Sequence, residues 1–259
     1  MDKGICLFIG FNGDIKTRVL KMKEAGFTHI MTSADKRFNK QNGTLKSQVK
    51  LFKEVGLKLS SLHSSYNKEE LPEFFKDSKI GHKIEKQLIK EVKLAKKYGF
   101  KCLVVHIKGE GSLVGLERAK RILKVCEKFN MPIAIENLRA EKGFYYLMEN
   151  IDHPYLKMCY DVGHNNVFEK DVNLVQKFKD KIICFHLHDN DGLADQHTLN
   201  ELGSIDWKQK AKDFKLIKQI PSLDYEILMY HKPNNITEDY VITQTYKNAC
   251  ELEELINKA

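Results

Sequence analysis

Eight short runs of aliphatic and β-branched residues alternate with amphipathic stretches along the whole sequence. The runs cover residues 4–9, 28–32, 57–63, 101–106, 132–136, 157–161, 182–188 and 223–228. Between them, apolar residues recur at three- and four-residue spacing, most clearly in residues 82–98, 114–129 and 237–258, which predicts helices with one buried face. This order is typical of successive βα units around a parallel sheet.

One phrase repeats where a helix should end and the next strand begin. The segments KEAGFTHI, KEVGLKLS and KKYGFKCL each place a Gly at this point, as expected of a helix C-cap. An open doubly wound sheet would also have parallel strands, but eight evenly spaced units favour closure into a barrel. No Pro-, Gly- or Ser-rich segment divides the chain. We therefore expect an α/β fold, a single (β/α)8 TIM barrel, with residues 1–259 as one domain.

The composition fits this expectation. The chain has 259 residues, of which 42% are hydrophobic and 30% charged, and single α/β barrels commonly need roughly 250 residues. No apolar run approaches the roughly 20 residues of a membrane span, and the first residues lack a cleavable signal pattern, so we expect a cytoplasmic protein without a membrane partner. The six cysteines are scattered without a CxxC motif, which favours buried, reduced thiols.

The charge of the chain raises the question of a nucleic-acid partner. The formal net charge is +8 and the pI is about 9.0, and a basic face can neutralise phosphates. However, the sequence has 38 Lys and only five Arg, whereas bidentate phosphate binding favours Arg. The Lys residues lie mostly on expected helices, mixed with Glu, which is typical of solvated faces.

Potential metal ligands lie at the ends of the expected strands. From the third run onward, the ligand-type residues at or near these ends are His63, His106, Glu136, Asp161, His186 and Glu226. Strand C-termini converge at one mouth of a barrel, so these side chains are expected to share one space. No thiolate pattern occurs among them, and imidazole with carboxylate suits Zn²⁺, Mn²⁺, Co²⁺ or Fe²⁺ without choosing among them.

Local spacing extends this set. Asp161 and His164 are three residues apart across a strand-to-helix turn, and Asp195 and His197 point the same way if extended. His186 and His188 share a strand face for the same reason, so His188 either orients a ligand or contacts substrate. We expect two long connections, residues 64–81 and 189–204, to be functional. The remaining histidines are expected to be structural or on the surface: His29, His82, His153 and His231.

Each candidate also has a structural explanation. A single His or Asp at a strand end is commonly a cap or a hydrogen-bonded loop residue. Glu136 could be a buried carboxylate neutralised by Arg139 or a Lys, because an isolated buried charge is costly. The convergence of six strand ends is what favours a metal site over these alternatives.

Four phrases carry a family resemblance: IAIENL, YDVGH, FHLHDND and DQHTLNELGSIDW. With them the chain resembles the xylose isomerase-like TIM-barrel superfamily, which unites sugar isomerases and epimerases with the endonuclease IV family. The resemblance to the epimerases implies one metal held by Glu136, Asp161, His186 and Glu226. The resemblance to endonuclease IV implies three zinc ions, with further ligands at His63, His106, His164, Asp195 and His197.

Departures from the nuclease pattern favour the sugar branch. The chain has HSSY in place of HAPY, and Ile107 where the nucleases have Pro; Tyr66 of HSSY either contacts DNA as in the nucleases or covers the mouth. Our first hypothesis is a divalent-metal-dependent isomerase or epimerase of a sugar, sugar phosphate or polyol. It uses one to three ions, with Zn²⁺ or Mn²⁺ favoured. The resemblance implies that Glu136 and Glu226 are catalytic and exchange a proton with the substrate.

Other residues are expected to bind the substrate. Trp207 would form an apolar wall, Lys108 and Arg139 would hold a phosphate group, and His188 would contact the sugar. The alternative hypothesis is an endonuclease IV-like zinc phosphodiesterase that cleaves DNA at abasic sites, and only this alternative gives the protein a nucleic-acid partner. A third possibility is a metal-stabilised binding module. The sequence leaves the oligomeric state open.

Overall fold

The computed structural model describes residues 1–229 and 235–259. Within these residues, eight parallel strands form one sheet in the order β7-β6-β5-β4-β3-β2-β1-β8. The strands are β1 (Lys3–Cys6), β2 (His29–Ser33), β3 (Lys58–His63), β4 (Cys102–Val105), β5 (Ile133–Glu136), β6 (Leu156–Asp161), β7 (Ile182–His186) and β8 (Leu223–Tyr225). His231 lies outside the described residues.

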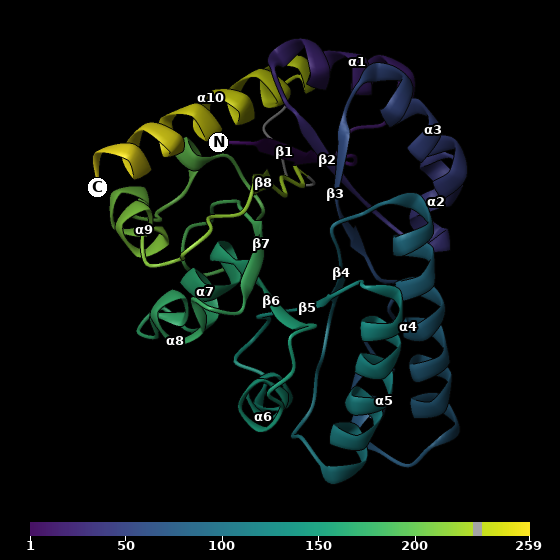
Figure 1. Cartoon of the computed structure of the whole chain (residues 1–259). Coiled ribbons are helices and arrows are strands. Elements are labelled where there is room, and N and C mark those ends of the chain that lie inside the picture. The colour runs from purple at the N-terminus through teal and green to yellow at the C-terminus, as the bar shows by residue number, and fades with distance from the viewer. Residues whose placement is uncertain (230–234) are drawn as a thin grey trace.

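The sheet closes between its two end strands. Leu187, just after β7, forms a parallel bridge with Tyr225 of β8. Its backbone nitrogen donates to Asp224 at 2.9 Å, and its carbonyl accepts from the backbone nitrogen of Glu226 at 2.9 Å. The strands occupy the centre of the molecule and the helices surround them (Figure 1). The expectation of a single (β/α)8 TIM barrel is therefore confirmed.

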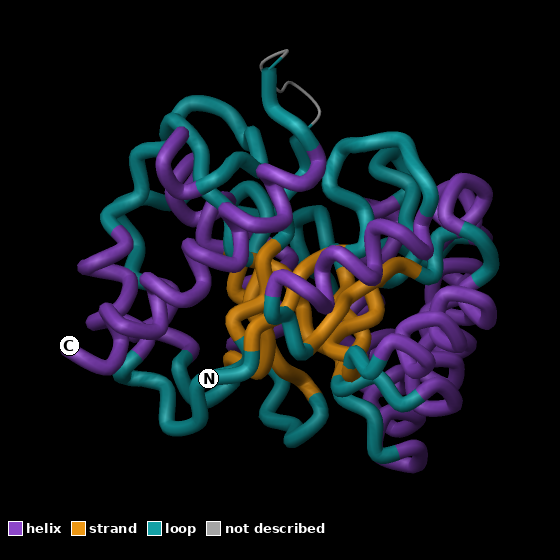
Figure 2. The backbone as a smooth tube through the Cα atoms, turned by 90° about the horizontal axis from the view of Figure 1, so that it is seen from above, coloured by secondary structure: helices purple, strands orange, loops and turns teal. Residues whose placement is uncertain are grey.

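Helices follow the strands as the periodicity predicts, and they lie on both sides of the strands in the view of Figure 2. They are α1 (Ile15–Ala25), α2 (Lys36–Asn42), α3 (Leu45–Val55), α4 (Lys79–Tyr98), α5 (Leu113–Phe129), α6 (Lys142–Asn150), α7 (Val162–Phe168), α8 (Leu174–Phe178), α9 (Trp207–Phe214) and α10 (Glu238–Lys258). Two 3-10 turns, η1 (Leu71–Phe75) and η2 (Asn200–Leu202), lie in the two long connections. None of the described helices is both long and apolar enough to cross a membrane.

A Gly residue forms the C-cap of each helix that the repeated phrase predicts. Gly26, Gly56 and Gly99 follow α1, α3 and α4 with φ values of 114°, 79° and 91°. These values lie in the left-handed region, which Gly adopts without the steric cost of a Cβ atom. Each backbone N–H then donates to carbonyls of the preceding turn. The chain can therefore reverse at once into the next strand.

Small side chains fill the interior of the barrel below the strand ends. Cys102, Val104, Ala134, Cys159 and Cys184 form a separate buried cluster there. All six cysteines are free, and five of them are buried, which agrees with the expectation of reduced thiols. Because side chains alternate along a strand, Cys159 and Cys184 share an interior face with the residues two positions later, Asp161 and His186. The thiols therefore lie directly beneath the barrel mouth.

Candidate metal centre at the barrel mouth

Four side chains from adjacent strand ends meet at the centre of the mouth. They are Glu136 at the end of β5, Asp161 at the end of β6, His186 at the end of β7 and Glu226 just after β8. One ligand atom from each lies within 4.8 Å of those of the other three. The Glu226 side chain is 19% exposed, whereas Glu136, Asp161 and His186 are buried. The group is therefore open to solvent on its Glu226 side.

The imidazole of His186 has the environment of a metal ligand. Its Nδ1 atom lies 3.1 Å from Glu136 Oε2 and 3.2 Å from Glu226 Oε2, yet this buried nitrogen makes no hydrogen bond. The two carboxylates thus converge on this ring nitrogen as ion-pair partners. Buried carboxylates need a compensating positive charge, and a divalent ion among these three groups would supply it. The residues present fit such an ion.

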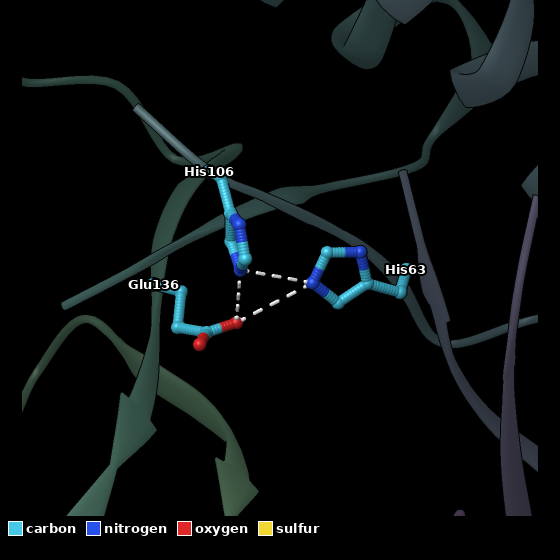
Figure 3. A group of neighbouring side chains, drawn as sticks. All are labelled: His63, His106 and Glu136. Atoms are coloured by element: carbon cyan, nitrogen blue, oxygen red, sulfur yellow. Dashed lines mark hydrogen bonds and ion pairs between the residues drawn. The ribbon is translucent and has the colours of Figure 1, made fainter. Parts of the chain in front are cut away.

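A second group borders the first through Glu136 (Figure 3). His63 and His106 place their Nε2 atoms 3.0 Å apart, and the carboxylate Oε2 of Glu136 lies 3.6 Å from His63 Nε2 and 3.2 Å from His106 Nε2. His63 Nδ1 lies 2.9 Å from the carbonyl oxygen of Ser64. Because that oxygen only accepts, Nδ1 carries the proton, and in the neutral ring Nε2 presents a lone pair. This orientation is the one that a metal ligand needs.

A third group lies beside Asp161, whose Oδ2 atom is 3.5 Å from His164 Nδ1. Asp195 Oδ2 lies 3.2 Å from His164 Nε2, and Asp195 Oδ1 lies 3.2 Å from His197 Nε2. The other nitrogen of each ring faces a backbone carbonyl at 2.9 Å, that of Asn137 for His164 and that of Glu226 for His197. Both Nε2 atoms are therefore directed into the group by the same device as in His63.

The charges in the three groups depend on one another. Burial alone would lower the pKa of His186, but the carboxylates of Glu226 and Glu136 raise it well above its ordinary value. Burial would conversely raise the pKa of Glu136, but His106 and His186 hold it well below its usual range. Among the described residues, no Lys or Arg forms an ion pair with Glu136, Asp161, Asp195 or Glu226. Positive charge at this centre comes from protonated imidazoles or from bound cations.

Comparison with known proteins places this barrel in a family. The model of the family described as "Xylose isomerase-like TIM barrel" matches residues 19–219. The chain belongs to the xylose isomerase-like TIM-barrel family. This finding confirms the resemblance that IAIENL, YDVGH and FHLHDND indicate in the sequence.

Several proteins are similar to this xylose isomerase-like barrel over most of its length, in sequence or in structure. The uncharacterized protein y4fM of Sinorhizobium fredii is 23% identical over 276 residues, which cover 92% of this chain and 88% of the relative. A solved D-tagatose 3-epimerase-like protein superposes with a TM-score of 0.77 at 16% identity, covering 100% of this chain and 99% of its own. A D-psicose 3-epimerase from Clostridium cellulolyticum gives a TM-score of 0.70 at 14% identity, with coverages of 100% and 99%. At these identities the solved structures show a common fold.

In this xylose isomerase-like barrel, His188 contacts Asp161 and His197. Its Nε2 atom is 3.0 Å and 3.1 Å from the two carboxylate oxygens of Asp161, and its ring stacks on His197 with centroids 3.7 Å apart. The side chain is 0% exposed, as is that of Asp161. These contacts support the orienting role, one of the two roles expected of His188, whereas its contact with a substrate stays a prediction.

Trp207 lies at the start of α9 and contacts Asp189 and Tyr225. Its indole nitrogen donates to Asp189 at 2.6 Å, and its ring lies 6.4 Å from that of Tyr225. It lines a cavity of about 360 Å³ beside α10, together with Asn248 and Leu252. None of these contacts is with the three ligand groups. These contacts anchor the start of α9, and the apolar wall for a sugar that is expected of Trp207 stays a prediction.

The two expected phosphate-binding cations lie on exposed positions after β4 and β5. Lys108 is exposed, and no ion pair to it occurs among the described residues. The Arg139 guanidinium lies 4.9 Å above the ring of Phe168, which in turn lies 6.1 Å from the His164 ring. Arg139 therefore stands near the third group, and it does not neutralise Glu136 as the structural alternative requires.

Asn137 is a site residue that the sequence patterns do not identify. Its amide nitrogen donates to the carbonyl of Asp161 at 2.8 Å, and its amide oxygen accepts from the backbone nitrogen of Asp161 at 2.9 Å. Its own carbonyl accepts from His164. This one residue thus fixes ligand positions in two groups. Its place directly after Glu136 in IAIENL is the signal that could have identified it.

Replacing Asn137 by Ala is expected to weaken ion binding by about 10- to 100-fold, because outer partners that orient metal ligands have effects of this size. Both hydrogen bonds to the Asp161 backbone are lost, so the carboxylate is no longer held in one orientation. Titration of ion-free protein with Mn²⁺ measures the change. Asn150→Ala is the matched control, since Asn150 is exposed and donates only to Tyr146. Equal affinities in all three proteins would show that Asn137 does not position the site.

Proposed function

We propose that the protein is a divalent-metal-dependent isomerase or epimerase that acts on a small sugar, sugar phosphate or polyol. The observation that carries the proposal is the convergence of Glu136, Asp161, His186 and Glu226 at one end of the barrel. Similar solved proteins named as D-tagatose 3-epimerase-like and D-psicose 3-epimerase share the fold over their full length, which supports a sugar as the substrate.

The central group would hold one ion, Zn²⁺ or Mn²⁺, through its three carboxylates and one imidazole. A bound divalent ion stabilises negative charge on substrate oxygens as a Lewis acid. The residues around it bind and orient the substrate and move the proton. Proton abstraction next to a carbonyl, and its return to a different face or carbon, converts one sugar into its epimer or isomer without any change in overall composition.

The two glutamates have different surroundings, which assigns them different tasks. Glu136 lies against four imidazoles, those of His63, His106, His164 and His186. Glu226 is partly exposed and lies near two imidazoles, those of His186 and His197. Burial would raise the pKa of Glu226, but His186 lowers it to about 2, so it is ionised at neutral pH. Glu226 is thus the more accessible base, with Glu136 as its partner on the opposite side of His186.

The rim supplies cations for an acidic substrate. Lys108 and Arg139 lie just beyond β4 and β5, whose ends carry His106 and Glu136. A phosphate on the substrate gains charge-assisted hydrogen bonds from such side chains. A sugar phosphate is therefore within the proposed substrate class, together with free ketoses.

Incubation in D₂O tests the proposed chemistry directly. The Mn²⁺- or Zn²⁺-loaded protein is mixed with a panel of ketohexoses that includes tagatose, psicose and fructose, together with ketose phosphates. We expect a new sugar that carries solvent deuterium at the carbon whose proton is exchanged, as seen by NMR and mass spectrometry. Absence of both turnover and exchange across the panel, with folded and ion-loaded protein, would reject the proposal.

A second candidate function rests on the two flanking groups. His63 and His106 with Glu136 on one side, and His164, Asp195 and His197 on the other, could each hold a further ion. Three zinc ions would suit an endonuclease IV-like phosphodiesterase, because adjacent ions can stabilise both the attacking and the leaving oxygen. Elemental analysis of protein purified without chelator, and cleavage of a duplex with one abasic site, test this candidate. About three zinc ions and salt-sensitive cleavage would replace the first proposal.

A further inference from the structure

We propose that the barrel contains a second ion position for a thiophilic metal, beneath the mouth, with Cys159 as its sulfur ligand. One ligand atom each of Glu136, Cys159 and His186 lies within 4.8 Å of the other two. Glu136 and Cys159 are direct neighbours in the β5–β6 register. All three residues are at most 1% exposed. An ion there would be enclosed by the barrel interior.

Further thiols surround this position. Cys159 is the register partner of Cys184 on β7, and both residues belong with Cys102 to one buried cluster. Three sulfur atoms thus lie together where barrels of this type usually place bulky branched residues. Thiolates select soft ions such as Cd²⁺ and Cu⁺, and they also bind Zn²⁺, whereas Mn²⁺ prefers oxygen ligands. The mouth and the interior therefore differ in which ions they favour.

The two positions share Glu136 and His186, so they cannot both use these ligands fully. His186 offers one ligand atom to each of the two groups, and its Nδ1 atom lies 3.1 Å from Glu136 Oε2 and 3.2 Å from Glu226 Oε2. A soft ion bound to Cys159 would draw both shared ligands away from an ion at the mouth. This competition rests on the proposed function, whereas binding of a soft ion to the thiol does not. We expect thiophilic ions to displace Mn²⁺ from the protein.

Titration of the ion-free full-length chain with CdCl₂ tests the sulfur ligand. A thiolate bound to Cd²⁺ gives a sulfur-to-metal charge-transfer band in the ultraviolet. We expect this band in the wild type, its loss in Cys159→Ser and Cys159→Ala, and its retention in Cys250→Ser. Cys250 is the matched control because it lies on α10, outside the barrel. Circular dichroism of each variant establishes that it is folded.

A competition experiment separates this inference from the proposed function. The electron paramagnetic resonance signal of bound Mn²⁺ is followed while Cd²⁺ is added. Cys159→Ser is expected to need at least about ten times more Cd²⁺ than the wild type to displace Mn²⁺. Losing one ligand contact of about 1.4 kcal/mol gives this factor. No thiolate band in the wild type, or an undiminished band in folded Cys159→Ser, overturns the inference and leaves Mn²⁺ binding at the mouth intact. A thiolate band without any Mn²⁺ binding supports the inference and contradicts the proposed function.

Discussion

Glu136→Gln is expected to reduce turnover by about 10²- to 10⁴-fold, the range that a positioned acid or base contributes, while the barrel remains folded. Gln keeps the shape of the side chain but removes its negative charge. The imidazoles of His63, His106, His164 and His186 all lie within 3.6 Å of the Glu136 carboxylate, so they lose their common counter-charge. Deuterium exchange in D₂O measures the activity, and circular dichroism measures the fold.

Glu226→Gln is the companion variant, and we expect a comparable loss of turnover. It should retain more bound ion than Glu136→Gln, because Glu226 belongs to one ligand group and Glu136 to three. Glu110→Gln is the control, since Glu110 is an exposed residue paired with Lys142. Wild-type turnover in either site variant would reject the assigned roles of the two glutamates.

Removal of the bound ion is expected to lower the melting temperature by about 10 °C. A ligand present at a thousand times its Kd stabilises the folded state by about 4 kcal/mol, and each kcal/mol shifts the melting temperature of a chain of this size by about 2 to 4 °C. The physical reason is that the buried carboxylates of Glu136 and Asp161 lose the cation that balances their charge. Thermal unfolding with EDTA, and again after Zn²⁺ or Mn²⁺ is restored, measures the shift.

Glu136→Gln provides the internal control for this measurement. Because that variant has lost the shared carboxylate, EDTA should change its melting temperature by much less than that of the wild type. If the wild type unfolds at the same temperature with and without EDTA, the mouth does not bind a stabilising ion.

The fold could be predicted from the sequence because its signals are local and periodic. The apolar runs and the Gly residues at 26, 56 and 99 locate strands and helix ends, and eight repeats of one unit favour closure. The predicted runs extend past the observed strands, for example to residue 188 where β7 ends at His186. The reason is that the chain leaves the sheet at the mouth, whereas the sequence beyond that point still consists of apolar residues and potential metal ligands.

The meeting of the ligands also follows from topology, since parallel strand ends share one mouth. The positions of His188 and Trp207 do not follow from it. They depend on how residues 189–204 turn back, and Asp189 fixes that turn by accepting from the backbone nitrogens of Ser204 and Ile205 at 2.9 Å and 3.1 Å. Such contacts join residues about 15 positions apart through a single side chain, and no periodic pattern encodes them.

The sharing of Glu136 among neighbouring groups has a consequence for how the centre fills. Cations that share one carboxylate ligand repel each other at short distance, so each ion added after the first is bound more weakly. If the groups hold ions as proposed, we expect loading to proceed in stages. One ion would be bound when free metal is scarce, and further ions when it is plentiful.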